Sequence, residues 1–455
     1  MGFIETIRGW IGKVYGYLFD KYIAVAKKDF DITPLNTAEV DTVISDCGRA
    51  YMGNPPWVNR EDGIATTSFA TIISQEVARL ATLAIGIKID GGPRAEWLQE
   101  RIDEIYFRLR HWVEYGCGYG TIILKVGGEG EVSVMTPSSF LPTDQSNGRI
   151  TGAVFRDEAK VGDKYYTRLE YHRFEDQATE VNDDDHNGQM DDTTKTVRQE
   201  DMGQDVKEDD DRVYVVSNIA YMSSTEDSIG ERIPLDRSPW DNLEDEVRLL
   251  HLEKPLFAVF RMPNANNVDI DSPYGLPVFA SAMEELKDLD IAYSRNAKEI
   301  FDSKRTVMID SDKLLMSGVA IGRVSMEDRV KSYGLPDYVK AVSAGSSRES
   351  LYQEINPTLN TDVRLTGINH LLSQIGYKCG FSNGYFVMDE KTGMMTATQV
   401  ESDDRRTIQL IKDVRGQLEE CLDSLIYVLD VYADLYELAP EGAYRGFRFQ
   451  NSACR

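Results

Sequence analysis

Cysteine and histidine are scarce in this chain, and neither is grouped. The 455 residues include 5 cysteines and 5 histidines. No CxxC pair occurs and no two histidines stand at ligand spacing, which excludes a zinc ribbon and a disulfide framework. The sequence predicts reduced thiols, no resident cofactor and no cysteine or histidine metal centre. The cysteines are Cys47, Cys117, Cys379, Cys421 and Cys454.

Motifs that carry common enzyme chemistry are also missing. The sequence contains no GxxxxGK[ST], HExxH or GxSxG pattern. The glycine-rich stretch Gly116–Gly120 has the wrong spacing for a dinucleotide-binding loop, and its place between a helix and a strand predicts a tight turn. No base is placed near any cysteine, so there is no candidate nucleophile. We therefore predict that the protein is not an enzyme.

Long apolar runs are absent as well. A membrane span needs roughly 20 consecutive apolar residues, and the best run here, 81–89, is short and contains Lys88. The N-terminal residues 1–30 contain Glu5, Arg8 and Lys13, which interrupt any signal-peptide core. With a mean hydropathy of -0.38, these features predict a protein without a membrane partner.

Basic residues are too few for a protein that binds nucleic acid tightly. Lysine and arginine number 50 against 76 acidic residues, which gives a net charge of -26. Tight DNA binding depends on neutralising phosphates with basic side chains. This chain therefore either does not bind DNA or contacts moving DNA without binding it tightly.

One segment, 175–211, holds much of this charge. It contains 15 acidic residues, three basic residues and no aromatic residue. Such a segment buries too little apolar surface to offset its ordering entropy. We predict a mobile surface insertion.

The same segment contains an incomplete calcium-loop pattern. Asp183, Asp185, Asn187 and Asp191 stand at positions 1, 3, 5 and 9 of the loop, but position 12 is Thr194 and not the glutamate that the loop requires. These four residues are the only metal-ligand candidates, and a solvated acidic loop is the alternative reading.

Hydrophobic periodicity predicts an α+β protein. In the first 260 residues, helices are expected at 68–83 and 97–115. They are followed by strands in which apolar and polar residues alternate. The remainder is mainly helical, with apolar residues at spacings of three and four. The strands are expected at 121–126, 131–135, 150–155, 164–173 and 212–218, and the later helices at 277–303, 359–377 and 396–438.

Several blocks, in this order, resemble the portal proteins of tailed bacteriophages, closest to the siphophage branch. The clearest are an Asn-rich block after a strand, a Ser-Pro-Tyr-Gly helix start and a basic helix end. The resemblance extends over most of residues 1–438. The blocks are 73–80, 116–142, 257–267, 271–277, 302–309, 375–382 and 394–401.

The resemblance implies a portal-type fold that forms a ring. Its parts would be an α/β wing, a helical stem, a small mixed α/β clip and a long C-terminal wing helix. The implied parts are the wing 1–272, stem helix 273–304, clip 305–357, stem helix 358–379, tunnel loop 380–395, wing helix 396–440 and a short tail 441–455. The acidic insertion is longer than we expect of the family, and the crown is expected to be absent or truncated.

The family resemblance also implies the function. Portal proteins form dodecameric DNA channels at one capsid vertex, for genome packaging and ejection. The expected partners are further copies of the chain, double-stranded DNA, the terminase large subunit, a head–tail connector, and the major capsid and scaffolding proteins. The expected location is the virion, and the host cytoplasm during assembly. Residues expected to face the DNA are Asp389, Glu390, Lys391, Thr392, Met394 and Met395 in the tunnel loop and Lys298, Lys304 and Arg305 in the stem.

Simple geometry is compatible with such a ring. Twelve helices side by side at about 10 Å give a ring with a centre-line diameter of about 38 Å. Subtracting a helix thickness of about 10 Å leaves a bore near 28 Å, wide enough for a hydrated duplex. The alternatives are another ring-forming head or adaptor protein, a calcium-dependent binding protein, and an enzyme without a recognisable motif.

Overall fold

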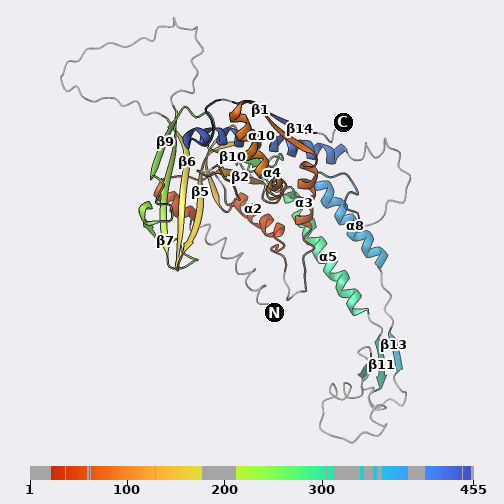
Figure 1. The fold of residues 1–455 in the computed structure, drawn as a ribbon. Coiled ribbons are helices and arrows are strands. Elements are labelled where there is room, and N and C mark those ends of the chain that lie inside the picture. Colours follow the sequence, from red (N-terminus) through yellow and green to blue (C-terminus); the bar gives the residue numbers. More distant parts are fainter. Residues whose placement is uncertain are drawn as a thin grey trace, which may run out of the picture. The chain divides into compact units, whose positions relative to one another are not determined.

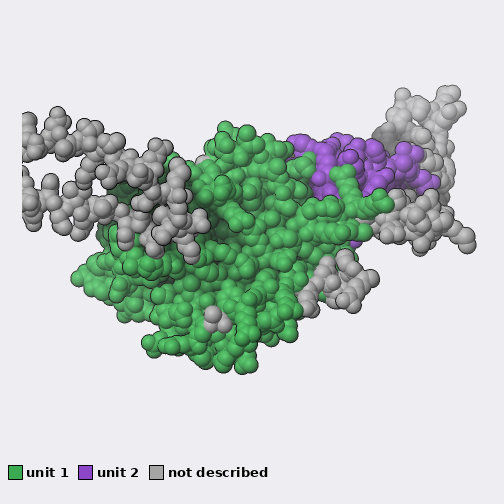
Figure 2. Space-filling view, turned by 90° about the horizontal axis from the view of Figure 1, so that it is seen from above, with its two compact units in different colours: residues 1–56, 68–281, 404–455 green, residues 57–67, 282–403 purple. Residues whose placement is uncertain are grey.

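The protein is a mixed α+β chain, as the periodicity predicts. The computed structural model describes residues 22–35, 37–58, 61, 63–128, 130–176, 212–303, 306–310, 339–342, 352–355, 361–387, 405–442 and 444–451. The chain divides into two compact units (Figure 2). Unit 1 comprises residues 1–56, 68–281 and 404–455, and unit 2 comprises residues 57–67 and 282–403.

The six-stranded sheet of unit 1 is antiparallel and has the order β4-β5-β6-β7-β8, with β9 also paired to β7. Its long strands β5, β6 and β7 stand side by side in Figure 1. Strands β6 and β7 remain in register until Asp176 lies opposite Arg212. The predicted acidic insertion therefore leaves and re-enters the sheet at neighbouring positions, while 177–211 itself lies outside the described residues. The strands are β4 (Phe140–Ser146), β5 (Arg149–Val161), β6 (Lys164–Asp176), β7 (Arg212–Ser223), β8 (Glu231–Ile233) and β9 (Glu246–Leu250).

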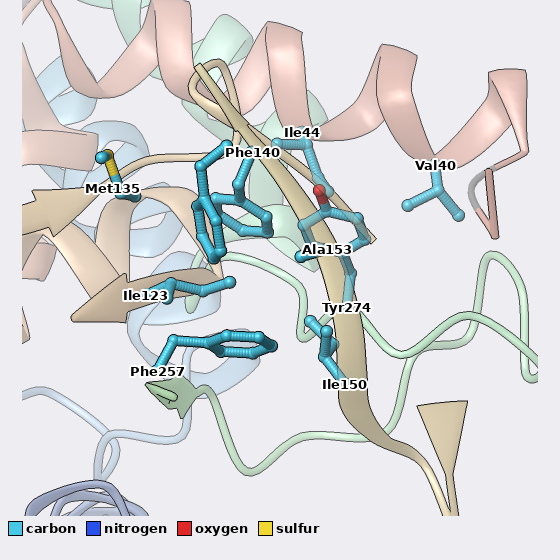
Figure 3. Close-up of a cluster of buried hydrophobic side chains, with 10 residues drawn as sticks. Val40, Ile44, Ile123, Met135, Phe140, Ile150, Ala153, Phe257 and Tyr274 are labelled. Atoms are coloured by element: carbon cyan, nitrogen blue, oxygen red, sulfur yellow. The ribbon is translucent and has the colours of Figure 1, made fainter. Parts of the chain in front are cut away.

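Both faces of this sheet carry buried side chains. One face packs against residues 22–30, which form a helix, and Tyr22 and Ala26 share a core with Leu169 and Ile219. The other face meets helix α2 (Ala38–Tyr51) and a second sheet. Figure 3 shows this second core, in which Phe140 lies among side chains from α2, β5 and the second sheet. Alternate residues of one strand thus serve two different cores.

The second sheet has the order β10-β2-β3 and packs against helices α4 and α10, and α3 in turn packs on these two helices. Every residue of β2 is buried. This explains why its sequence reads as a continuous apolar run with one lysine. The sheet strands are β2 (Thr121–Val126), β3 (Val132–Met135) and β10 (Phe257–Arg261), and the helices are α3 (Phe69–Ala81), α4 (Pro93–Tyr119) and α10 (Arg405–Leu435); the short 3-10 helix Leu235–Arg237 lies between β8 and β9.

The prediction of a tight turn over Gly116–Gly120 was wrong for most of the stretch. Helix α4 continues to Tyr119, and only Gly120, with φ of 82°, makes the turn. A Cβ on Gly116 would lie 2.2 Å from the Phe260 ring, and one on Gly118 would lie 2.8 Å from the Tyr51 ring. These glycines are needed because aromatic rings pack directly on the helix backbone.

A small sheet that the sequence did not predict joins distant parts of unit 1. Strand β1 (Ile85–Gly91) pairs antiparallel with β14 (Tyr444–Asn451). The predicted short tail therefore contains a strand.

Unit 2 is built on helices α5 (Met283–Asp302) and α8 (Thr361–Lys378). The described part of the predicted clip is a sheet in the order β12-β11-β13, in which β11 and β12 are parallel. Helix α5 begins later than the predicted Pro277, because Val278 N–H donates to Cys117 O (3.0 Å) and Phe279 is buried in unit 1. The remaining bounds are β11 (Thr306–Asp310), β12 (Val339–Val342), β13 (Tyr352–Ile355) and the 3-10 helix Ala280–Ala282. Within the described residues, no helix is long and apolar enough to cross a membrane.

Candidate functional site: the antiparallel helix pair of unit 2

Helices α5 and α8 lie alongside each other and run in opposite directions (Figure 1). Lys378 Nζ, at the end of α8, lies 2.6 Å from Glu285 Oε1, near the start of α5. At the opposite end of the pair, Arg364 forms an ion pair with Glu299. These two contacts lie at opposite ends of the pair, as its antiparallel direction requires.

Both helices carry buried apolar side chains. Leu286 and Leu289 are buried on α5, and Ile368, Leu372 and Ile375 are buried on α8. Spacings of three and four residues place such side chains on one face of a helix. Leu286, Ile368, Leu372 and Ile375 belong to the predicted apolar stripes, whereas Leu289 does not.

Asp290 interrupts the α5 stripe for a specific reason. Its carboxylate is 3% exposed. Oδ2 accepts a hydrogen bond from Trp57 Nε1 (2.9 Å), and Oδ1 accepts from the Thr67 backbone N–H (2.7 Å) and hydroxyl (2.8 Å). One turn later, Ser294 Oγ accepts from the Ala65 N–H (3.0 Å). Asp290 thus fastens the two ends of segment 57–67 to the helix.

Other apolar side chains of the pair are exposed to solvent. Tyr293 and Ile300 on α5 are 48% and 52% exposed, and Val363 and Leu365 on α8 are 74% and 36% exposed. Tyr293 and Ile300 continue the stripe that begins at Leu286. Clustered exposed apolar residues on a surface often mark a contact with another molecule. We call these four residues the exposed apolar set.

Of the predicted stem cations, the described structure places only Lys298. It is exposed near the end of α5, three residues after exposed Arg295. Lys304 and Arg305 lie outside the described residues. Within α5 itself, three basic residues stand against six acidic residues, so the helix as a whole is acidic.

The first part of the predicted tunnel loop is a compact turn at the end of α8. Phe381, Tyr385 and Phe386 form an aromatic cluster with ring centroids 4.7 to 5.0 Å apart. A Cβ on Gly376 would lie 3.2 Å from Phe386 Cδ2, so this glycine allows the ring to pack on α8. The proposed DNA-facing residues Asp389, Glu390, Lys391, Thr392, Met394 and Met395 lie outside the described residues.

The described cysteines offer no reactive thiol. All four are buried and unbridged. Burial raises the pKa of Cys47 to about 12, and burial together with Glu285 raises the pKa of Cys379 well above its usual range. A buried thiol in its protonated form is a poor nucleophile.

A second group of polar residues lies inside unit 1, around Glu170 on β6. Lys125 Nζ and Arg168 Nη2 each lie 2.6 Å from Glu170 Oε2, and His172 Nε2 lies 2.6 Å from Oε1. Asp157 forms ion pairs with Lys125 (3.4 Å) and with Arg168. Burial alone would raise the pKa of Glu170, but Lys125, His172 and Arg168 outweigh it and hold that pKa well below 4.5.

Both ring nitrogens of His172 have polar partners. Nδ1 lies 2.8 Å from Tyr214 OH, which also accepts from the Leu256 N–H (2.9 Å). Nε2 faces the Glu170 carboxylate, which can only accept, so Nε2 carries a proton. Burial lowers the pKa of His172, and the hydrogen bond with Glu170 only partly offsets the effect.

This polar cluster is a structural element. Glu170, His172 and Tyr214 are 6%, 1% and 0% exposed, so a substrate has no access to them. The described residues contain no group of three or more metal-ligand side chains suited to an ion. The calcium candidates Asp183, Asp185, Asn187 and Asp191 lie outside the described residues.

No protein-family model and no curated protein matches the chain.

Proposed function

We propose that this chain is the portal protein of a tailed bacteriophage. It would be a non-enzymatic subunit of a ring of about twelve copies, through which double-stranded DNA enters and leaves the capsid. The observation that carries the proposal is the antiparallel pair α5 and α8 with its exposed apolar set, in a chain whose sequence blocks resemble that family. The connection of the two helices through the small sheet β11 to β13 fits the stem and clip of the same family.

The exposed apolar set gives a physical reason for assembly. Fully burying one valine, leucine or isoleucine side chain contributes about 1.5–3 kcal/mol. A neighbouring copy that covers Ile300 and Val363 gains this contribution at every interface of a closed ring. A ring also lets each copy use two different faces, which a two-fold dimer does not.

The charge of the chain supports a conduit for DNA. A net charge of -26 repels phosphates, so the DNA can move without being held. Lys298 and Arg295 supply exposed cations on α5 for brief contacts. The terminase large subunit, a head–tail connector, and the major capsid and scaffolding proteins are proposed partners because the family resemblance implies them.

The assembly is tested by native mass spectrometry and negative-stain imaging of the purified chain. We expect rings with a central hole. Ile300→Glu and Val363→Glu should each shift the population toward monomers, because each places a charge in the apolar contact. Gln374→Glu adds the same charge at an exposed polar position of α8 and should leave the rings intact. Monomers alone over a wide concentration range would contradict the proposal.

The DNA conduit is tested separately in a packaging assay. A Lys391→Glu variant should still form rings but should package or retain less DNA, because it removes a cation predicted to face the channel. Packaging at the wild-type rate would contradict the tunnel-loop assignment without contradicting ring assembly.

A further inference from the structure

The small sheet of unit 1 has two edges, and helix α4 covers the edge of β1. Tyr106 OH donates to Ile85 O (2.7 Å), and Gln99 Nε2 donates to Ile87 O (3.2 Å). Gln99 Oε1 accepts from the Ile89 N–H (2.9 Å). The Gln99 amide thus takes the place of a peptide group of a neighbouring strand.

These bonds also determine the direction of the backbone groups of β14. Since Ile87 and Ile89 direct their N–H and C=O groups toward α4, they do not bond to β14. In an antiparallel pair, residues directly opposite each other share this orientation. Phe449 lies opposite Ile87, and Phe447 lies opposite Ile89. The N–H and C=O groups of both phenylalanines therefore point away from β1, and no other described strand pairs with them.

The side chains of β14 have two distinct faces. Phe447 and Phe449 are partly buried and share the face of Ile85 and Ile89, which are buried. Arg448 lies on the opposite face with its side chain 67% exposed, although it contacts Asp90 (2.8 Å). The strand contains two arginines and no acidic residue, in a chain that carries a net charge of -26.

We propose that the outer edge of β14 binds an extended segment of another protein as an added strand, and that this segment alternates apolar and acidic side chains. The apolar residues would continue the face of Phe447 and Phe449, and the acidic residues would lie beside Arg448. Main-chain hydrogen bonds give such strand addition its affinity, while the side chains give its specificity.

A second copy of β14 is a poor occupant of this edge. If Phe447 of one copy lies opposite Phe449 of the other in an antiparallel pair, Arg448 faces Arg448. Like charges directly opposite each other destabilise a strand pair. The proposed strand addition at β14 is independent of the proposed portal function.

The test uses the full chain and two short fluorescein-labelled peptides. In one, valine and glutamate alternate, and in its twin lysine replaces each glutamate. We expect the glutamate peptide to bind at least about tenfold more tightly in fluorescence anisotropy, because like charges disfavour the twin. Phe449→Pro should abolish binding, since proline removes one outward N–H but is tolerated on an edge strand. Phe449→Val keeps that N–H and should retain binding.

Hydrogen exchange supplies a direct readout of the edge. The amides of Phe447 and Phe449 should exchange rapidly in the free protein and slowly with the glutamate peptide, whereas the Arg448 amide should exchange slowly in both. Protection of both phenylalanine amides in the free protein would overturn the proposal, because it would show that the chain or a second copy already occupies the edge. Failure of the glutamate peptide to bind, or equal binding of both peptides, would also overturn it.

Discussion

Replacing Glu170 by glutamine tests whether the buried polar cluster is held together by balanced charge. In the native protein Lys125 and Arg168 stand against Glu170 and Asp157, with His172 neutral. Glutamine keeps the size of the side chain and an acceptor oxygen, but it removes one negative charge. Two buried cations then share one carboxylate.

The expected cost follows from this imbalance. Removing one partner of a buried ion pair costs about 3–5 kcal/mol, because the remaining charge is left uncompensated. This is a large part of the roughly 5–15 kcal/mol that stabilises a typical domain. At an m-value of about 3 kcal/mol/M, the urea midpoint should fall by about 1–1.7 M.

The assay is urea unfolding at neutral pH, followed by tryptophan fluorescence. The Trp240 ring lies 5.6 Å from the guanidinium carbon of Arg168 and reports on this region. Adding Lys125→Met to Glu170→Gln leaves one cation, Arg168, opposite Asp157. This double variant should recover at least about 1 kcal/mol relative to Glu170→Gln alone. The reasoning would be refuted if Glu170→Gln lowered the unfolding free energy by less than about 1 kcal/mol. It would also be refuted if the loss in the double variant equalled the sum of the losses in the two single variants.

Three further predictions concern other parts of the molecule. Because the folded-state pKa of His172 lies below the usual 6.5, the unfolded chain takes up the proton first and stability should fall as pH drops below 6.5; His172→Gln should flatten this dependence in urea titrations between pH 7 and 5. Replacing 177–211 by Asn-Gly should change the unfolding free energy by less than about 1 kcal/mol, because Asp176 and Arg212 already face each other and suit a two-residue turn; aggregation of this variant would contradict the prediction. Asp290→Ala should destabilise unit 2 by about 1–3 kcal/mol by leaving buried donors unsatisfied, with faster hydrogen exchange at the amide of Thr67, whereas unchanged exchange would show that the segment is held by other contacts.

In unit 1, local patterns predicted strands β2, β3, β5, β6 and β7 and helices α3, α4 and α10. They missed helix α2 and strands β1, β4, β8, β9 and β14. Pro277 suits the first turn of a helix, yet α5 begins at Met283, since the preceding residues bond to and pack within unit 1. Strands β1 and β14 are far apart in the sequence. No local window reveals that they pair.

The candidate site was predictable to a similar extent. The apolar stripes of α5 and α8 follow directly from the spacing of their residues. The role of Asp290 does not, because its hydrogen-bond donors come from segment 57–67, which is distant in the sequence. The polar cluster was missed, although Arg168, Glu170 and His172 alternate along β6. Alternation shows that they share one face of the strand, but it cannot show that this face is buried as well.

The discontinuity of unit 1 has a consequence for protein synthesis. Arg415 on α10 donates to the carbonyl oxygens of Leu80 (2.9 Å) and Ala81 (2.8 Å) at the end of α3. Residues 282–403 belong to unit 2 and are synthesised between these two parts. At about 5–20 residues per second, this interval of roughly 120 residues lasts about 6–25 s. During that time the nascent chain displays the apolar surfaces of α3, α4 and β10 that α10 later covers, so the ribosome-bound chain should be a substrate for chaperones that recognise exposed apolar segments.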